Sequence, residues 1–210
     1  MGSSLATALM LFASVTTASG VAPREVIQTA VARVIAALDG VEPDRSDRAE
    51  RGALGNERSR AEIRRIAHDL FDFEEMSKRA LSRHWVARTP AERAEFVSLF
   101  TDLLERSYIS KVEAYAGEKI VYVGETVDGG VALVRSRVVT PRRRQDTALD
   151  YRLLLRDGRW RVYDVIVDGV SFVATYRSEF NRVIGASSYA ALVDAMKGKR
   201  LQVKTVERRS

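Results

Sequence analysis

The hydrophobic period of the chain changes at Gly117 from about 3.6 residues to two, and this change constrains the fold more than any other feature. After Gly117, alternating patterns predict four strands, over 118–126, 130–140, 147–156 and 159–167. DGG at 128–130 and DG at 157–158 are hairpin-turn sequences, because glycine supplies the positive φ that tight turns need. The middle of the chain is therefore predicted to be an antiparallel four-stranded meander.

Helices are predicted on both sides of this sheet. Apolar residues at three- and four-residue steps indicate helices over 24–39, 60–70, 73–83, a long segment behind Pro90, 170–184 and 187–197, with a short helix between loops in 40–58. Three helix starts have capping-box spacing, at Ser59, Asp72 and Thr89. The long helix carries a continuous apolar stripe formed by Phe96, Leu99, Phe100, Leu103, Leu104, Tyr108, Val112 and Tyr115. This order predicts an α+β fold in which six to seven helices pack with the sheet.

Composition limits the classes of protein to consider. The 210 residues are 46% hydrophobic and 30% charged, as in a globular protein with a sizeable core. With 4 Pro and 13 Gly there is no evident linker, so we expect one domain over 23–200 and a basic tail over 201–210. Because the chain has no cysteine, disulfides, thiolate nucleophiles and thiolate-held metals are excluded. The net charge of +6 favours anionic partners.

The first 22 residues are typical of a secretory signal peptide. They carry no charged side chain, and the apolar run over 5–15 is followed by small residues over 16–22. The run is shorter than the roughly 20 apolar residues that a bilayer requires. No Lys or Arg precedes it, which departs from the usual pattern, and an N-terminal core helix is the alternative. We expect export, with a mature chain beginning near Pro23.

The sequence offers little for catalysis. There are two histidines, His68 and His84, and no HExxH, GxSxG, phosphate-loop or dinucleotide-binding motif. Asp150, Asp164 and Asp168 lie on or after the last two strands and are interpreted as turn and hydrogen-bonding acids. We therefore predict that the protein is not an enzyme and uses no metal or cofactor. No nucleic acid is expected either, because the basic cluster Arg142, Arg143 and Arg144 has no interleaved aromatic residues for base stacking.

Two long segments, 71–108 and 159–184, resemble the MlaC family, also called the toluene-tolerance family, of periplasmic phospholipid-binding proteins. The most specific matches are DF at 72–73 with Met76, RHW at 83–85, TP at 89–90, YDV at 163–165, GVS at 169–171, and YRS at 176–178 with Phe180. The resemblance implies a periplasmic carrier that moves phospholipid between an outer-membrane lipoprotein complex and an inner-membrane ABC transporter complex. It also implies a hydrophobic cavity, between a curved sheet and helices, that takes the acyl chains.

The expected lipid-binding residues come from the long helix, the sheet and the helix after the sheet. They are Leu103, Tyr108, Val112, Tyr115, Leu153, Leu155, Val165, Val167, Phe172 and Tyr176. Each Leu and Val also suits a plain core position, whereas Tyr108 and Tyr176 can pack a ring on acyl chains and turn a hydroxyl toward water or a headgroup. Contacts with headgroups or partners are expected at Arg142, Arg143, Arg144 and Arg177.

Two interpretations stay open at this point: a lipid carrier that works with an ABC transporter, and an accessory or binding protein of another lipid pathway. Some relatives of the family are associated with hopanoid biosynthesis, so the cargo of an accessory or binding protein could be a hopanoid or another prenyl lipid. We expect the protein to act as a monomer in either case.

Overall fold

The structure is a computed structural model that describes residues 20–39, 50–140 and 146–201. The helices are α1 (Pro23–Asp39), α2 (Glu50–Leu70), α3 (Phe73–Leu81), a 3-10 turn η1 (Ser82–His84), α4 (Pro90–Glu113), α5 (Phe172–Ala186) and α6 (Tyr189–Lys197). The strands are β1 (Lys119–Asp128), β2 (Val131–Val139), β3 (Thr147–Arg156), β4 (Arg159–Val167) and β5 (Val170–Ser171).

The strands form one antiparallel sheet in the order β1-β2-β3-β4-β5. The predicted four-stranded meander and the α+β class are thus confirmed, with six α-helices among the described residues and the short β5 as an additional edge strand. Because β5 uses Val170 and Ser171, the helix that follows begins at Phe172 and not at 170 as predicted.

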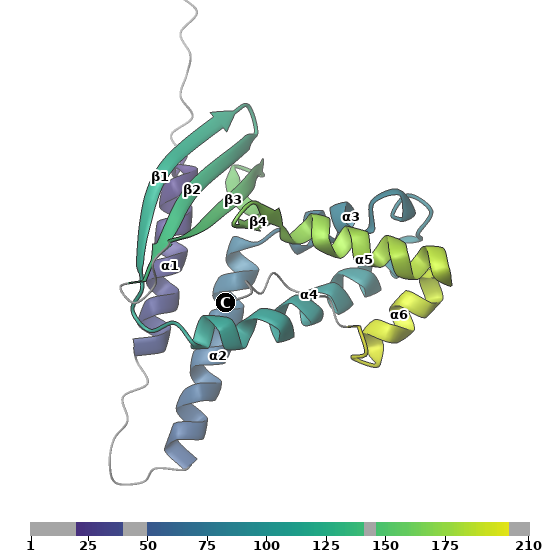
Figure 1. Cartoon of the computed structure of the whole chain (residues 1–210), viewed down its shortest axis with the longest axis horizontal. Coiled ribbons are helices and arrows are strands. Elements are labelled where there is room, and N and C mark those ends of the chain that lie inside the picture. Colours follow the sequence, from purple (N-terminus) through teal and green to yellow (C-terminus); the bar gives the residue numbers. More distant parts are fainter. Residues whose placement is uncertain (1–19, 40–49, 141–145, 202–210) are drawn as a thin grey trace, which may run out of the picture.

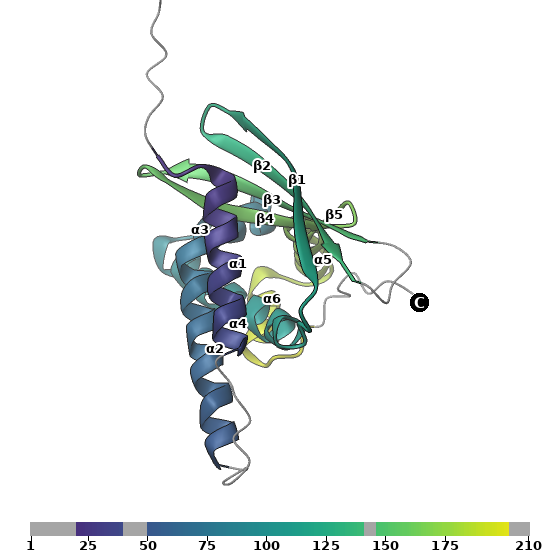
Figure 2. The same cartoon turned by 90° about the vertical axis from the view of Figure 1, so that its left-hand side faces the viewer.

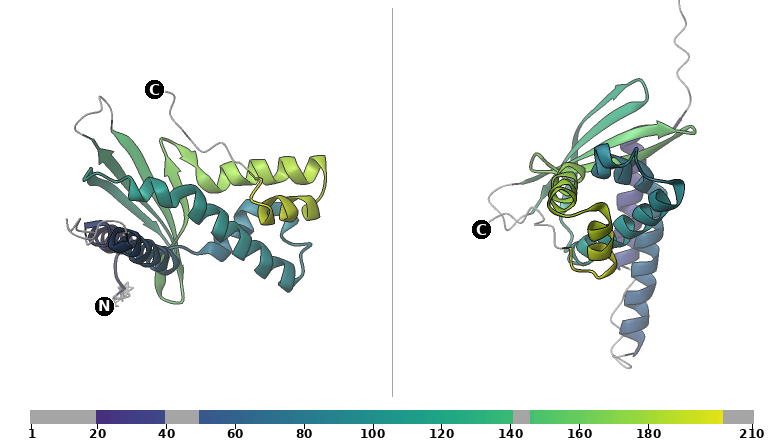
Figure 3. Two further views of the ribbon diagram at one scale, coloured as in Figure 1. Left: turned by 90° about the horizontal axis from the view of Figure 1, so that it is seen from below. Right: turned by 90° about the vertical axis from the view of Figure 1, so that its right-hand side faces the viewer.

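The helices form two groups around the sheet. The curved sheet is flanked by α1, which lies beside α2 and against β2 (Figures 1 and 2). The other group, α3 to α6, packs together beyond one end of the sheet, as the view from below shows (Figure 3). A two-helix arm, α1 and α2, and a four-helix group, α3 to α6, therefore flank the sheet.

Two predicted helix starts are confirmed by their capping contacts. The Asp72 carboxylate accepts a hydrogen bond from the backbone N–H of Glu75 at 2.9 Å. Thr89 forms both halves of a capping box with Glu92, and Pro90 occupies the first turn of α4. These contacts satisfy backbone N–H groups that have no partner within the helix, and so they fix where α3 and α4 begin.

The predicted helix start at Ser59 is wrong. Ser59 lies inside α2, and its hydroxyl donates a hydrogen bond of 2.8 Å to the carbonyl oxygen of Ala37 at the end of α1. The first turns of α2 extend past the neighbouring elements (Figure 1), so they need no apolar face. The sequence over 40–58 therefore predicts loops and a short helix, whereas the structure has 50–58 as part of α2. Residues 40–49 are outside the described part of the chain.

The long helix is shorter than predicted. α4 ends at Glu113, and Tyr115 lies beyond it with its hydroxyl donating to the carbonyl oxygen of Glu118 at 2.7 Å. Gly117 follows with a φ of +87°, which a residue without a Cβ adopts at little cost. The change of hydrophobic period at Gly117 therefore coincides with a real reversal between helix and sheet.

The buried side chains form two apolar clusters. The sheet cluster, between the sheet and α1, consists of Ile27, Ala132, Val134, Tyr151, Leu153, Val162 and Val165. The helix cluster is formed by α3 to α6 together with Trp85 after η1 and Tyr163 of β4, and it consists of Met76, Ala80, Leu81, Trp85, Phe96, Phe100, Leu103, Leu104, Tyr163, Val173, Tyr176, Phe180, Leu192 and Met196. The site described next lies where these two clusters meet.

Candidate lipid site between two apolar clusters

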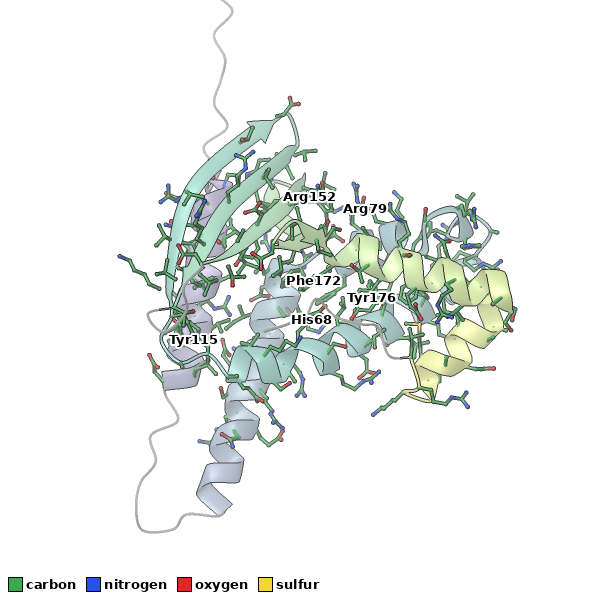
Figure 4. The ribbon with its side chains drawn as sticks, in the orientation of Figure 1. His68, Arg79, Tyr115, Arg152, Phe172 and Tyr176 are labelled. Atoms are coloured by element: carbon green, nitrogen blue, oxygen red, sulfur yellow. The ribbon has the colours of Figure 1, made fainter. Side chains whose placement is uncertain are left out.

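A stacked aromatic pair joins the two clusters. Tyr108 of α4 packs against the helix cluster, and Phe172 of α5 packs against the sheet cluster. Their rings are stacked with centroids 4.5 Å apart and an interplanar angle of 16°. Phe172 and Tyr176 lie close together between the sheet and α4 (Figure 4). We call the group formed by Ser107, Tyr108, Phe172 and Tyr176 the seam.

Phe172 is held in place by the polar junction between β4 and α5. The hydroxyl of Ser171 caps α5 by accepting from the N–H of Ala174, and it donates to the Asp164 carboxylate at 2.6 Å. Asp164 also accepts from the N–H of Val173 at 3.1 Å and from the guanidinium of Arg152 at 3.2 Å. With 2% of its surface exposed, Asp164 has its charge compensated inside the protein. The prediction that it is a hydrogen-bonding acid is confirmed.

Two tyrosine hydroxyls near the clusters are buried without a hydrogen-bond partner, those of Tyr122 and Tyr176. The Tyr176 hydroxyl lies near the hydroxyls of Ser107 and Tyr108 but forms no hydrogen bond of normal geometry with them. Burial raises the pKa of Tyr108 and of Tyr176 above the usual value for a phenol, so both hydroxyls stay protonated at neutral pH. They are neutral groups able to donate a hydrogen bond in an apolar setting.

The sheet cluster is only partly covered at its margin. Eight apolar or aromatic side chains that pack against it are half-buried, namely Val31, Leu70, Phe71, Tyr122, Leu149, Trp160, Val167 and Phe172. Each therefore leaves some apolar surface exposed to water, which is unfavourable by roughly 25 cal/mol per Å². A ligand with an apolar body would gain free energy by covering them.

Comparison with known proteins assigns the family. The family model described as MlaC protein matches residues 45–198, most of the chain. The chain belongs to the MlaC family. A similar solved structure is the phospholipid-binding protein from Ralstonia solanacearum in complex with a phospholipid, with a TM-score of 0.73 and 24% sequence identity over 86% of this chain and 97% of that chain. This likeness shows that the two proteins share the MlaC-like fold.

In this MlaC-family chain the predicted lining residues divide between the two clusters. Leu103 and Tyr176 are buried in the helix cluster, which Tyr108 adjoins. Leu153 and Val165 are buried in the sheet cluster, and Val167 and Phe172 are half-buried against it. The structure therefore brings Tyr108, Phe172 and Tyr176 together at the seam and leaves Leu103, Leu153, Val165 and Val167 in or against the clusters on either side.

Three predicted lining residues lie elsewhere. Val112 is half-buried in the last turn of α4, and Tyr115 lines a separate cleft of about 570 Å³ beside Arg60 and Glu113. Leu155 is 42% exposed at the end of β3. Sequence reasoning did not single out Ser107 and Tyr122, and the position of Tyr122 opposite Ser136 on β2 is known only from the structure.

Of the four arginines predicted to contact headgroups or partners, only one lies in the described part of the chain. Arg177 is exposed on α5 and lines a cleft of about 690 Å³ that is described below. Arg142, Arg143 and Arg144 are outside the described residues.

The two histidines are engaged with neighbours. His68 Nε2 lies 3.2 Å from a carboxylate oxygen of Glu105, and His84 Nε2 lies 3.0 Å from the side-chain oxygen of Asn181. Within residues 20–39, 50–140 and 146–201, no three acidic or histidine side chains gather as a metal site. Among those same residues, no helix has the length and apolar character to cross a bilayer.

Proposed function

We propose that this MlaC-family protein is a periplasmic carrier that holds a phospholipid by its acyl chains between the sheet cluster and the helix cluster. The seam is the point at which the two clusters separate to admit the chains. The single observation that carries the proposal is the stacked pair of Tyr108 and Phe172, because it lies where the two apolar clusters meet.

Energetics support enclosure of the acyl chains. At about 0.8 kcal/mol per CH₂, an acyl chain of about 16 carbons costs roughly 13 kcal/mol to expose to water. A carrier that crosses an aqueous compartment must therefore cover the chains fully. The half-buried side chains around the sheet cluster supply apolar contacts without directional bonds, which suits a cargo that has to leave again.

The buried hydroxyls support a lipid with polar linkages. A buried donor without a partner costs about 1–3 kcal/mol. Ester or phosphate oxygens near the glycerol backbone would accept from the hydroxyls of Tyr176 and Tyr122. Membership of the MlaC family and the shared fold with a phospholipid-binding protein support a phospholipid as the cargo.

The cellular role extends this proposal. The family resemblance supports shuttling between an outer-membrane lipoprotein complex and an inner-membrane ABC transporter complex. The charge-free segment over 1–22 supports export to the periplasm by a signal peptide. The described part of the protein begins at residue 20, so 1–19 is outside it.

Native mass spectrometry of the protein purified from a bacterial envelope fraction tests the proposal. Near-stoichiometric phospholipid, identified after organic extraction, is the expected result. If the bound mass is that of a hopanoid or prenyl lipid, the proposed cargo and pathway change and the proposed carrier mechanism stands. A mass without lipid, unchanged after incubation with phospholipid vesicles, would contradict the function.

A further inference from the structure

Two adjoining clefts form one groove beside α3. The first, about 690 Å³, lies between α3, β3, β4 and α5. The second, about 810 Å³, lies between α3 and α4. They share four lining residues, Glu75, Lys78, Trp85 and Val86, so they are continuous along α3 and η1. None of the four seam residues lines this groove.

Cationic side chains outnumber anionic ones along the groove. Its lining includes six cations, Lys78, Arg79, Arg93, Arg152, Arg156 and Arg177, and three carboxylates, Glu74, Glu75 and Asp164. Two of the carboxylates are buried and already compensated, Glu75 by Arg79 at 2.8 Å and Asp164 by Arg152 at 3.2 Å. The groove therefore presents a net positive potential to solvent.

Two of these arginines have no carboxylate partner. Arg177 is exposed and forms no ion pair or hydrogen bond within the described part of the chain. Arg93 donates to the carbonyl oxygens of Trp85 and Val86, each at 3.2 Å, and its guanidinium lies over the Trp85 ring. Arg152 and Arg79 stand together where the sheet meets α3 (Figure 4). Positive charge thus lies along the groove and does not converge on one point.

The shared wall of the groove also presents an apolar side chain. Val86 is 80% exposed, the largest exposure among the bulky apolar residues described. It lies two residues after the end of η1, and its carbonyl oxygen accepts a hydrogen bond from Arg93. A ligand that covers Val86 while contacting the surrounding cations must combine apolar and acidic groups.

We propose that this groove is the docking site for an acidic segment of a protein partner, one that carries Asp or Glu side chains beside an apolar residue that covers Val86. A single phosphate group fills much less space than either cleft, and the cations come from α3, α4, α5 and β3. A peptide segment spans that length and pairs with charges spaced along it. The assignment does not depend on which cargo the seam binds.

Fluorescence anisotropy with labelled synthetic peptides tests this assignment. One short peptide combines Glu, Leu and Ala, with Leu at helical spacing, and a second has Lys at every Glu position. We expect the full chain to bind the acidic peptide and not the basic one, with affinity falling as salt rises. Arg177→Glu is expected to weaken binding by about tenfold.

Arg58→Glu is the matched control, because Arg58 is also an exposed helical arginine but lies on α2, outside the groove. It is expected to change the affinity by less than about twofold. Equal weakening by both variants would mean that net charge alone attracts the peptide, and would overturn the assignment.

Two other results would overturn it. One is that the wild type does not bind the acidic peptide. The other is that it binds anionic phosphatidylglycerol vesicles through Arg177 and ignores the peptide, which would make the groove a membrane-docking surface. Native mass spectrometry of Arg177→Glu separates this result from the proposed function, since bound lipid is expected at wild-type level.

Discussion

Phe172 stacks on Tyr108 with a centroid separation of 4.5 Å, although the two rings pack against different apolar clusters. Phe71 also packs against both clusters, so the stacked pair is one of the contacts that join them. In contrast, Phe180 is fully buried within the helix cluster, where it contacts Phe96 and Phe100 edge-on. Stability and cargo binding are therefore expected to depend on different aromatic residues.

A pair of truncations tests this separation. Phe172→Ala is expected to cost about 1–2 kcal/mol of stability, because the ring is only half-buried, and to reduce retained lipid by about tenfold. Phe180→Ala is expected to cost about 3–5 kcal/mol while lipid per folded molecule stays near wild type. Urea unfolding measures the first quantity and native mass spectrometry the second. Loss of lipid from both variants alike would place the cargo elsewhere.

Removal of one hydroxyl tests the polar part of the site. Tyr176→Phe deletes a buried hydroxyl that has no hydrogen-bond partner, so the lipid-free protein is expected to keep its stability or gain up to about 1 kcal/mol. Lipid binding is expected to weaken, since an ester or phosphate oxygen loses a donor. Thermal unfolding of delipidated protein and lipid exchange with vesicles are the measurements. If the variant binds lipid as tightly as wild type, this hydroxyl does not contact the cargo.

Asp164 is expected to contribute much more to the free energy of unfolding than an exposed carboxylate in a similar ion pair. Asp164→Asn leaves Arg152 and the start of α5 without their charged acceptor, and the expected cost is about 3 kcal/mol. Asp102→Asn breaks an exposed pair with Arg106 and is expected to cost less than about 0.5 kcal/mol. Urea denaturation compares the two variants, and equal costs would contradict the role given to Asp164.

The ion pair between α2 and α4 predicts an acid-dependent contribution to stability. Hydrogen bonding to Arg60 lowers the pKa of Glu113, so its carboxylate stabilises the folded state above its usual pKa of about 4.3. That contribution is lost as pH falls through the lowered pKa. Glu113→Gln is therefore expected to be less stable than wild type at pH 7, and the difference is expected to shrink toward pH 3. Thermal unfolding of both proteins between these two pH values measures the difference in stability. A difference that stays constant with pH would contradict the prediction.

The fold was largely predictable because its signals are local. Alternation over the strands, glycine in the hairpin turns and the capping residues Asp72 and Thr89 each depend on neighbours in sequence. The error at Ser59 has the opposite cause, since its hydroxyl bonds to Ala37 on another helix. A tertiary hydrogen bond of this kind leaves no local pattern.

The site was less predictable than the fold. The apolar stripe of α4 indicated Leu103 and Tyr108 but not which cluster each would join, because that depends on how the helices pack around the sheet. Leu155 has the same period as Leu153, yet it lies at the strand end and is 42% exposed. Tyr108 and Tyr176 of the seam are the residues for which ring and hydroxyl chemistry, and not periodicity alone, favoured a binding role.

Successive residues of the β4–α5 junction contribute to two different surfaces. Ser171 and Val173 line the basic groove, whereas Phe172 between them belongs to the seam. Asp164 holds both neighbours of Phe172 and also the groove residue Arg152. If a carboxylate in the groove competes for Arg152 and shifts this junction, occupancy of the groove and of the seam become thermodynamically linked. Each ligand then changes the affinity of the other by the same factor, so loading state and docking would regulate each other without a separate switch.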